Sequence, residues 1–124
     1  MRTIARIIIM ELDDNAGKSK DVFKSKIELD KLKIDLVSHK VIKDGSEISL
    51  TNLEFNLLIY LASQPGRVFT YQQIYESVWK EPYTYEKNNI MTHISHLRAK
   101  IEPDPTHPRY INNVRGVGYR FTKE

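Results

Sequence analysis

The chain has 124 residues, and its apolar fraction of 40% and charged fraction of 28% are those of a single soluble globular domain. It contains no cysteine, which excludes disulfide frameworks and thiolate metal sites. Its apolar runs, such as Ile7 to Met10, are too short to cross a bilayer. We therefore expect a cytoplasmic protein that has no membrane partner.

The net charge of +3 is distributed unevenly along the chain. Residues 1–86 carry 12 Lys and Arg against 13 Asp and Glu, whereas residues 87–124 carry 7 against 3. A basic C-terminal third beside a neutral remainder is typical of a surface that binds a polyanion.

The first 25 residues give the weakest pattern. Residues 4–12 fit a short helical face, and Arg6 to Met10 also fit a β-rich run. Residues 13–20 are polar and typical of a turn, although Asp13 and Asp14 leave an acidic metal pocket as an alternative. We interpret residues 1–25 as a segment that leads into the domain and not as part of its core.

From Lys26 to Leu50 apolar and charged residues alternate, which predicts strands near 26–29, 32–37, 39–43 and 46–50. Asp44-Gly45 is a hairpin turn signal between the last two, because glycine tolerates positive φ. The four antiparallel strands form a sheet with one apolar face, which another element must cover.

Two capping boxes predict the starts of the next two helices. Thr51 with Glu54 begins a helix that runs to about Ser63, where Pro65-Gly66 stops it. After a short extended stretch at 67–70, Thr70 with Gln73 begins a second helix that ends near Trp79.

The following loop, 80–87, leads to a third helix at 88–101. Ile90, Ile94, Leu97 and Ile101 form one apolar stripe with the period of a helix. The opposite face carries donors and small residues, namely Asn88, Thr92, Ser95, His96 and Ala99. Such a face fits a DNA major groove, and an ordinary solvated amphipathic helix is the alternative.

The C-terminus predicts a β-hairpin, with residues 110–114 and 119–121 as its arms and Arg115 at its tip. The whole order predicts an α+β fold: a winged helix-turn-helix with an N-terminal four-stranded antiparallel sheet, three helices and a C-terminal β-hairpin wing. The domain occupies residues 26–124.

In a helix-turn-helix the second helix enters the major groove, here 88–101. Thr92, Ser95 and His96 are the candidates for base edges. Arg98 and Lys100 suit phosphates, and the tip at 115–118 would bring Arg115 into a minor groove. Two alternatives remain open: Arg98 pairs with Glu102 one turn on, and the rings of Trp79 and Tyr119 are partly packed against the domain.

No nucleophile motif and no glycine-rich phosphate loop occurs in the sequence. We therefore expect no enzyme, no cofactor and no metal site. His93 and His96 are three residues apart, which leaves zinc as an alternative, but no cysteine or carboxylate accompanies them nearby.

Residues 26–121 resemble the C-terminal effector domain of the OmpR/PhoB family of two-component response regulators. Four stretches carry the resemblance, in the family's order and spacing: Ile48-Ser-Leu-Thr-Asn-Leu-Glu-Phe-Asn-Leu-Leu58, Pro65-Gly-Arg-Val-Phe-Thr70, His93-Ile-Ser-His-Leu-Arg98 and Val114-Arg-Gly-Val-Gly-Tyr-Arg120. The resemblance implies a bacterial transcription regulator that binds double-stranded promoter DNA, usually with a second copy in tandem on direct repeats. It also implies contact between loop 80–87 and RNA polymerase.

Residue by residue, the resemblance implies phosphate and minor-groove contacts for Arg98 and Arg115, and a backbone contact for Trp79. Asn88 stands where the family often has Arg, and Asn113 where it often has Thr. The full predicted DNA-binding set is Trp79, Asn88, Thr92, Ser95, His96, Arg98, Lys100, Asn113, Arg115 and Tyr119.

The family's receiver domain needs about a hundred residues, more than the 25 that precede the first predicted strand. We expect residues 1–25 to be a linker or a remnant of a preceding receiver domain, and DNA binding without a phosphorylation switch in this chain. A second hypothesis is a winged-helix interaction module that docks a protein through loop 80–87 and does not bind DNA.

Overall fold

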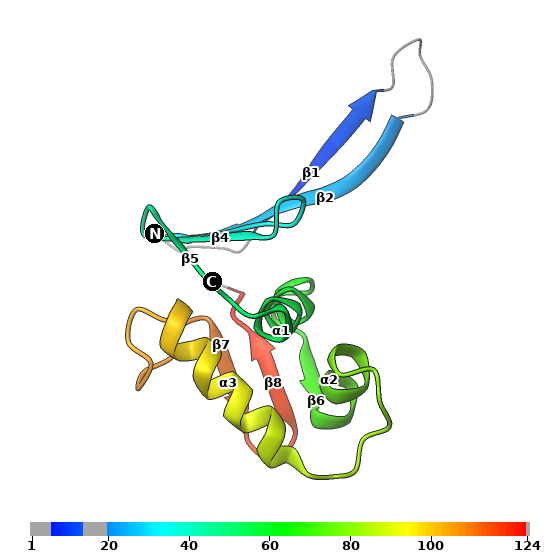
Figure 1. Cartoon of the computed structure of the whole chain (residues 1–124), viewed down its shortest axis with the longest axis vertical. Coiled ribbons are helices and arrows are strands. Elements are labelled where there is room, and N and C mark those ends of the chain that lie inside the picture. Colours follow the sequence, from blue (N-terminus) through cyan, green and yellow to red (C-terminus); the bar gives the residue numbers. More distant parts are fainter. Residues whose placement is uncertain (1–5, 14–19, 124) are drawn as a thin grey trace.

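A computed structural model describes residues 6–13 and 20–123, with side chains from residue 26 on, and shows two antiparallel sheets and three helices (Figure 1). The elements are β1 (Arg6–Asp13), β2 (Lys20–Leu29), β3 (Leu32–Asp35), β4 (Lys40–Lys43), β5 (Ser46–Ile48), α1 (Asn52–Ala62), β6 (Val68–Thr70), α2 (Tyr71–Val78), α3 (Lys87–Ile101), β7 (Ile111–Val114) and β8 (Gly118–Phe121). The predicted α+β winged helix-turn-helix is confirmed.

The first sheet has the strand order β1-β2-β3-β4-β5. The four strands predicted between residues 26 and 50 are present as β2 to β5, and Asp44 and Gly45 both adopt positive φ in the turn before β5. A fifth strand, β1, comes from the segment interpreted as leading into the domain. It pairs with β2 from Arg6 opposite Glu28 to Asp13 opposite Lys20.

The β-rich alternative for residues 6–10 is therefore the one that the structure shows, as a run of β-branched isoleucines favours. Residues 1–5 and most of the polar turn, 14–19, lie outside the described residues. That residues 1–25 join the domain to a preceding receiver stays a prediction.

Both capping boxes are confirmed. Glu54 N–H donates to Thr51 Oγ1 at 3.1 Å, and the carboxylate of Glu54 accepts from Thr51 N–H at 3.0 Å. Thr70 and Gln73 make the same exchange at 3.1 and 2.9 Å. Each box therefore binds two backbone N–H groups at the helix start with local side chains, as the sequence predicts.

The second sheet has the order β6-β8-β7, so the short stretch before α2 joins the C-terminal hairpin as a third strand. Thr70 lies opposite Gly118, and Val114 lies opposite Gly118 on the other side. A Cβ atom on Gly118 would lie 1.9 Å from the carbonyl oxygen of Phe69. Glycine therefore permits the close approach of β6 to β8.

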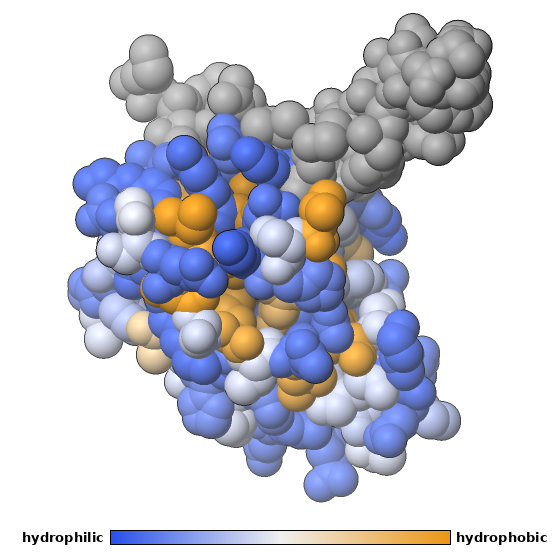
Figure 2. Space-filling view, turned by 45° about the horizontal axis from the view of Figure 1, so that its top comes forward, coloured by the Kyte–Doolittle hydropathy of each residue, from blue (hydrophilic) through white to orange (hydrophobic). Residues whose placement is uncertain are grey.

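One apolar core joins both sheets to the helices. The stripe of α3 is buried as predicted, since Ile90, Ile94, Leu97 and Ile101 are each at most 1% exposed. In Figure 1, α1 lies beneath the first sheet, and α3 runs beside β7 and β8. Figure 2 shows a mostly hydrophilic face with small apolar patches. No helix within residues 6–13 and 20–123 is long and apolar enough to cross a membrane.

Candidate nucleic-acid interface

The face of α3 away from the core is exposed and carries no acidic residue. Its exposed members are Asn88, Asn89, Met91, Thr92, Ser95, His96 and Ala99. They offer amide, hydroxyl and imidazole donors along one side of a 15-residue helix. The predicted base-edge candidates Thr92, Ser95 and His96 thus share one open surface, which the rest of the domain leaves uncovered.

Trp79 lies at the end of α2, half-buried between two rings. It stacks on Tyr75 with the ring centroids 5.0 Å apart, and His93 meets it edge-on at 5.3 Å. His93 Nδ1 donates to Asn89 O at 2.8 Å, because a carbonyl can only accept. Packing of Trp79 inside the domain is therefore present, and it fixes the ring at the edge of the exposed face of α3.

The zinc alternative for His93 and His96 finds no support in this geometry. Among the residues whose side chains are described, no group of three His, Cys, Asp or Glu could hold a metal ion.

Arg98 turns away from the exposed face of α3 toward β7. Its Nη2 donates to Ile111 O at 2.8 Å and to Asn113 Oδ1 at 2.6 Å, and its guanidinium carbon lies 5.6 Å from the centre of the Tyr119 ring. Burial lowers its pKa, although Tyr119 and Glu102 oppose the change. Arg98 thus links α3 to the C-terminal hairpin, a role that spacing along the chain did not predict.

Lys100 also differs from the expectation of a phosphate anchor. Its Nζ forms an ion pair with Glu54 Oε1 at 2.6 Å, and Glu54 is only 4% exposed. Burial alone would raise the pKa of Glu54, but the bonds from Lys100 and Thr51 outweigh it and hold the pKa below its usual value. Removing Lys100 would leave the buried carboxylate of Glu54 without a positive partner. The ammonium group of Lys100 therefore stabilises the contact between α1 and α3.

The wing supplies two exposed candidates and one buried one. Asn113 and Arg115 are exposed, the latter at the tip where Gly116 has a φ of +77°. Tyr119 is only 2% exposed, because its ring packs edge-on against Tyr71 beneath Arg98. The ring of Tyr119 therefore belongs to the core, and the predicted contact of this residue with DNA stays a prediction.

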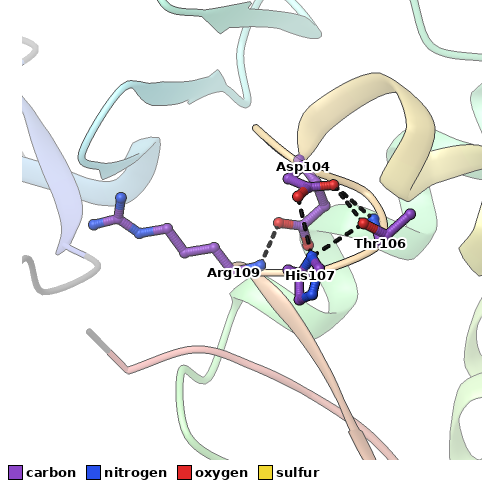
Figure 3. A network of polar contacts seen from close by, with 5 residues as sticks. Asp104, Thr106, His107 and Arg109 are labelled. Carbon is purple, nitrogen blue, oxygen red and sulfur yellow. Dashed lines mark hydrogen bonds and ion pairs between the residues drawn. The ribbon is translucent and has the colours of Figure 1, made fainter.

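Glu102 forms a polar junction that the sequence analysis missed. It is 1% exposed, and its carboxylate accepts from the backbone N–H groups of Arg109, Tyr110 and Ile111 at 2.6–3.1 Å. Figure 3 shows the loop that it closes, in which Asp104 bonds with Thr106 and His107. Glu102 is therefore committed to the start of β7, and these bonds take the place of the alternative pairing with Arg98.

The first sheet makes polar contacts with the C-terminal end of α3 through Lys43, and Asp30 in the turn after β2 pairs with Arg109 in the segment before β7. Lys43 Nζ donates to the carbonyls of Glu102 at 3.0 Å and Lys100 at 3.4 Å, where a cation is favoured by the helix dipole. Arg109 pairs with Asp30 at 2.8 Å. No local sequence pattern predicts these contacts, because the partners are more than 50 residues apart.

Loop 80–87 carries a row of aromatic rings beside α2. Tyr83 lies 5.5 Å from Tyr75 and 5.2 Å from Tyr85, measured between ring centres. Tyr85 is 78% exposed, which makes it the most open large apolar side chain described. The loop therefore presents the exposed ring of Tyr85 beside the half-buried Tyr83, which lies against α2.

Residues 45–121, which include α1 to β8, match the family model described as "Transcriptional regulatory protein, C terminal". The chain belongs to this family. YcbL of Bacillus subtilis (strain 168), described as an uncharacterized transcriptional regulatory protein, is 45% identical over 95 residues, which are 77% of this chain and 42% of YcbL. MtrA of Mycolicibacterium smegmatis, a DNA-binding response regulator, is 44% identical over 89 residues, which are 72% of this chain and 39% of MtrA.

Two solved structures share the fold. DrrB, a Thermotoga maritima OmpR/PhoB homolog, aligns with a TM-score of 0.74 and 37% identity over 80% of this chain and 45% of DrrB. The RstA DNA-binding domain of Klebsiella pneumoniae, solved in complex with the RstA box, aligns with a TM-score of 0.74 and 27% identity over 80% of this chain and 98% of that domain.

These likenesses establish a transcriptional regulatory protein C-terminal domain of the OmpR/PhoB type, as the resemblance implied. The chain spans about two fifths of the length of the curated relatives that it matches.

Proposed function

We propose that this domain binds double-stranded promoter DNA sequence-specifically and acts as the effector domain of a two-component response regulator. The observation that carries the proposal is the exposed, acid-free face of α3 next to an exposed arginine at the wing tip. The RstA DNA-binding domain, which shares the fold, was solved in complex with the RstA box. The relatives named as response regulators support the transcriptional role.

In the proposed complex α3 lies in the major groove, where Asn88, Thr92, Ser95 and His96 face base edges. Arg115 enters the adjacent minor groove, because the negative electrostatic potential of a narrow minor groove attracts a guanidinium. A second copy binds in tandem on a direct repeat. Selection of bound sequences from a random duplex pool tests this arrangement, since it reports the half-site, its orientation and its spacing together.

Binding should weaken steeply as salt increases, because cations that neutralise phosphates release condensed counterions. Arg98 and Lys100 are engaged within the domain, which leaves about four phosphates to be neutralised and predicts a slope of log K against log salt of about −4. Fluorescence anisotropy with a labelled operator at several salt concentrations measures this slope. A duplex affinity that does not change with salt would contradict the proposal.

Replacing Arg115 with alanine should weaken operator binding by about 1–3 kcal/mol and leave the unfolding temperature unchanged. The side chain is exposed at the wing tip, so its loss affects the contact and not the core. Arg120→Ala is the matched control, because Arg120 is exposed on β8 opposite Asn112 and outside the proposed interface. Equal affinities for the Arg115→Ala variant and the unmodified protein would remove the wing from the site.

The row of aromatic rings favours a second candidate, a protein contact made by loop 80–87, with RNA polymerase as the partner that the resemblance implies. Tyr85 offers the exposed apolar area that such contacts use. Tyr85→Ala separates the two functions, since it should reduce activated transcription from a promoter template while operator affinity stays the same. A loss of operator affinity in this variant would place the loop in the DNA contact instead.

A further inference from the structure

Asn113 lies where α3 meets the C-terminal hairpin. It lies on β7 opposite Tyr119 of β8, and its side chain is exposed. With Arg98 it lines a hollow on the surface, together with Pro105, Thr106, Pro108 and Asn112. A group that approaches this hollow from a bound duplex would therefore meet the carboxamide of Asn113.

Arg98 determines which end of that carboxamide faces outward. Its Nη2 lies 2.6 Å from Asn113 Oδ1, and a guanidinium can only donate. The carboxamide must therefore turn its oxygen to Arg98 and its NH2 group away from that guanidinium. Within residues 26–123 the Nδ2 of Asn113 has no hydrogen-bond partner, so both of its protons remain available.

The orientation is held on several sides. The same Nη2 of Arg98 donates to Ile111 O at 2.8 Å, and the guanidinium lies over the Tyr119 ring. Both contacts come from the hairpin itself, so Arg98 and Asn113 move with the wing as one unit. A carboxamide in solution can donate or accept, whereas this one is restricted to donating outward.

We propose that Arg98 is a positioning residue that locks the Asn113 carboxamide with its NH2 group outward, so that Asn113 donates to an acceptor on bound DNA. The acceptor is a phosphate oxygen or an acceptor atom of a base edge. The inference rests on the proposed function and changes the role of Arg98, which acts on DNA through Asn113.

Asn113→Asp tests the donor. The new carboxylate has the same shape and keeps an oxygen for Arg98, but it loses both outward protons and presents a negative charge. Operator affinity should fall about 10- to 100-fold. Asn113→Thr should stay within about threefold, because a hydroxyl accepts from Arg98 and still donates its own proton. Asn52→Asp, at the first turn of α1, is the matched control for the added charge.

A double-mutant cycle tests the positioning role. Arg98→Met keeps much of the side-chain volume but removes the donors. If Arg98 acts through the amide, Asn113→Ala should cost about five- to tenfold in the unmodified protein and less than about twofold in the Arg98→Met background. The NH2 resonances of Asn113 provide a second measurement, since operator should shift them in the unmodified protein and not in Arg98→Met.

The outcomes separate this inference from the proposed function. If the unmodified protein binds operator and Asn113→Asp binds within threefold of it, the donor role is wrong. If the losses from Arg98→Met and Asn113→Ala multiply independently, Arg98 contacts DNA itself and the positioning role is wrong. An unmodified protein that binds no duplex overturns both the proposed function and this inference. If Asn113→Asp loses the same affinity for operator and for random duplex, the acceptor is a phosphate. If it loses affinity for operator alone, the acceptor is a base.

Discussion

Replacing Glu102 with alanine is expected to lower the free energy of unfolding by about 3–5 kcal/mol. The carboxylate is 1% exposed and accepts from three consecutive backbone N–H groups, those of Arg109, Tyr110 and Ile111. Alanine would leave these donors without a partner inside the domain. Because small domains are stable by only about 5–15 kcal/mol, much of the stability would be lost. Urea denaturation followed by tryptophan fluorescence measures the change.

Glu102→Gln serves as the graded control. The amide keeps one acceptor oxygen but brings an NH2 group against backbone donors, so we expect an intermediate loss of about 2 kcal/mol. Asp104→Ala controls for the loss of a carboxylate in the same loop, where the side chain is exposed and should matter little. An alanine variant within about 1 kcal/mol of the unmodified protein would show that the loop rearranges and finds other partners for its N–H groups.

Gly118→Ala is expected to destabilise the domain by about 3 kcal/mol or more, or to prevent folding. A Cβ there would lie 1.9 Å from Phe69 O and 2.9 Å from Phe69 C, and both atoms belong to the backbone of β6. A backbone cannot yield as a flexible side chain does, so β6 and β8 would have to separate. The start of α2 would move with them, since Tyr71 N–H donates to Val117 O. Thermal unfolding by circular dichroism tests the prediction.

Gly116→Ala is the control within the same hairpin. Gly116 has a φ of +77°, and a Cβ atom added there would have no neighbouring atom within 4 Å, so alanine would add only backbone strain. That strain is about 1 kcal/mol. If Gly116→Ala and Gly118→Ala lowered the free energy of unfolding equally, the backbone freedom of glycine, and not the close approach of β6, would explain the glycine at 118.

The parts of the fold that the sequence predicts are those decided by neighbours along the chain. The capping boxes at Thr51 and Thr70 involve residues three positions apart, and the stripe from Ile90 to Ile101 is one face of one helix. The turn at Asp44-Gly45 likewise needs only local backbone geometry. The paired strand β1 is an exception, because residues 6–10 fit a helix or a strand until a partner strand selects one.

The roles of charged side chains depend on contacts that local patterns do not contain. Lys100 resembles a free cation in sequence, but the buried carboxylate that binds it lies 46 residues away. Glu102 is one turn from Arg98, yet three backbone donors of the next strand bind it more favourably. Tyr119 belongs to a family motif, which says nothing about the burial of its ring in this chain.

The amine of Lys43 at the carbonyl end of α3 has a mechanical consequence. At a rise of about 1.5 Å per residue the helix is about 22 Å long; its buried stripe packs it along its length, and the first sheet supports its C-terminal end. A tilt of about 5° at that support would displace Asn88 at the far end by about 2 Å, more than the roughly 0.5 Å within which a hydrogen bond keeps its geometry. In the proposed complex, the stiffness of this contact and of the buried stripe therefore limits how accurately the N-terminal end of α3 can be positioned against a base.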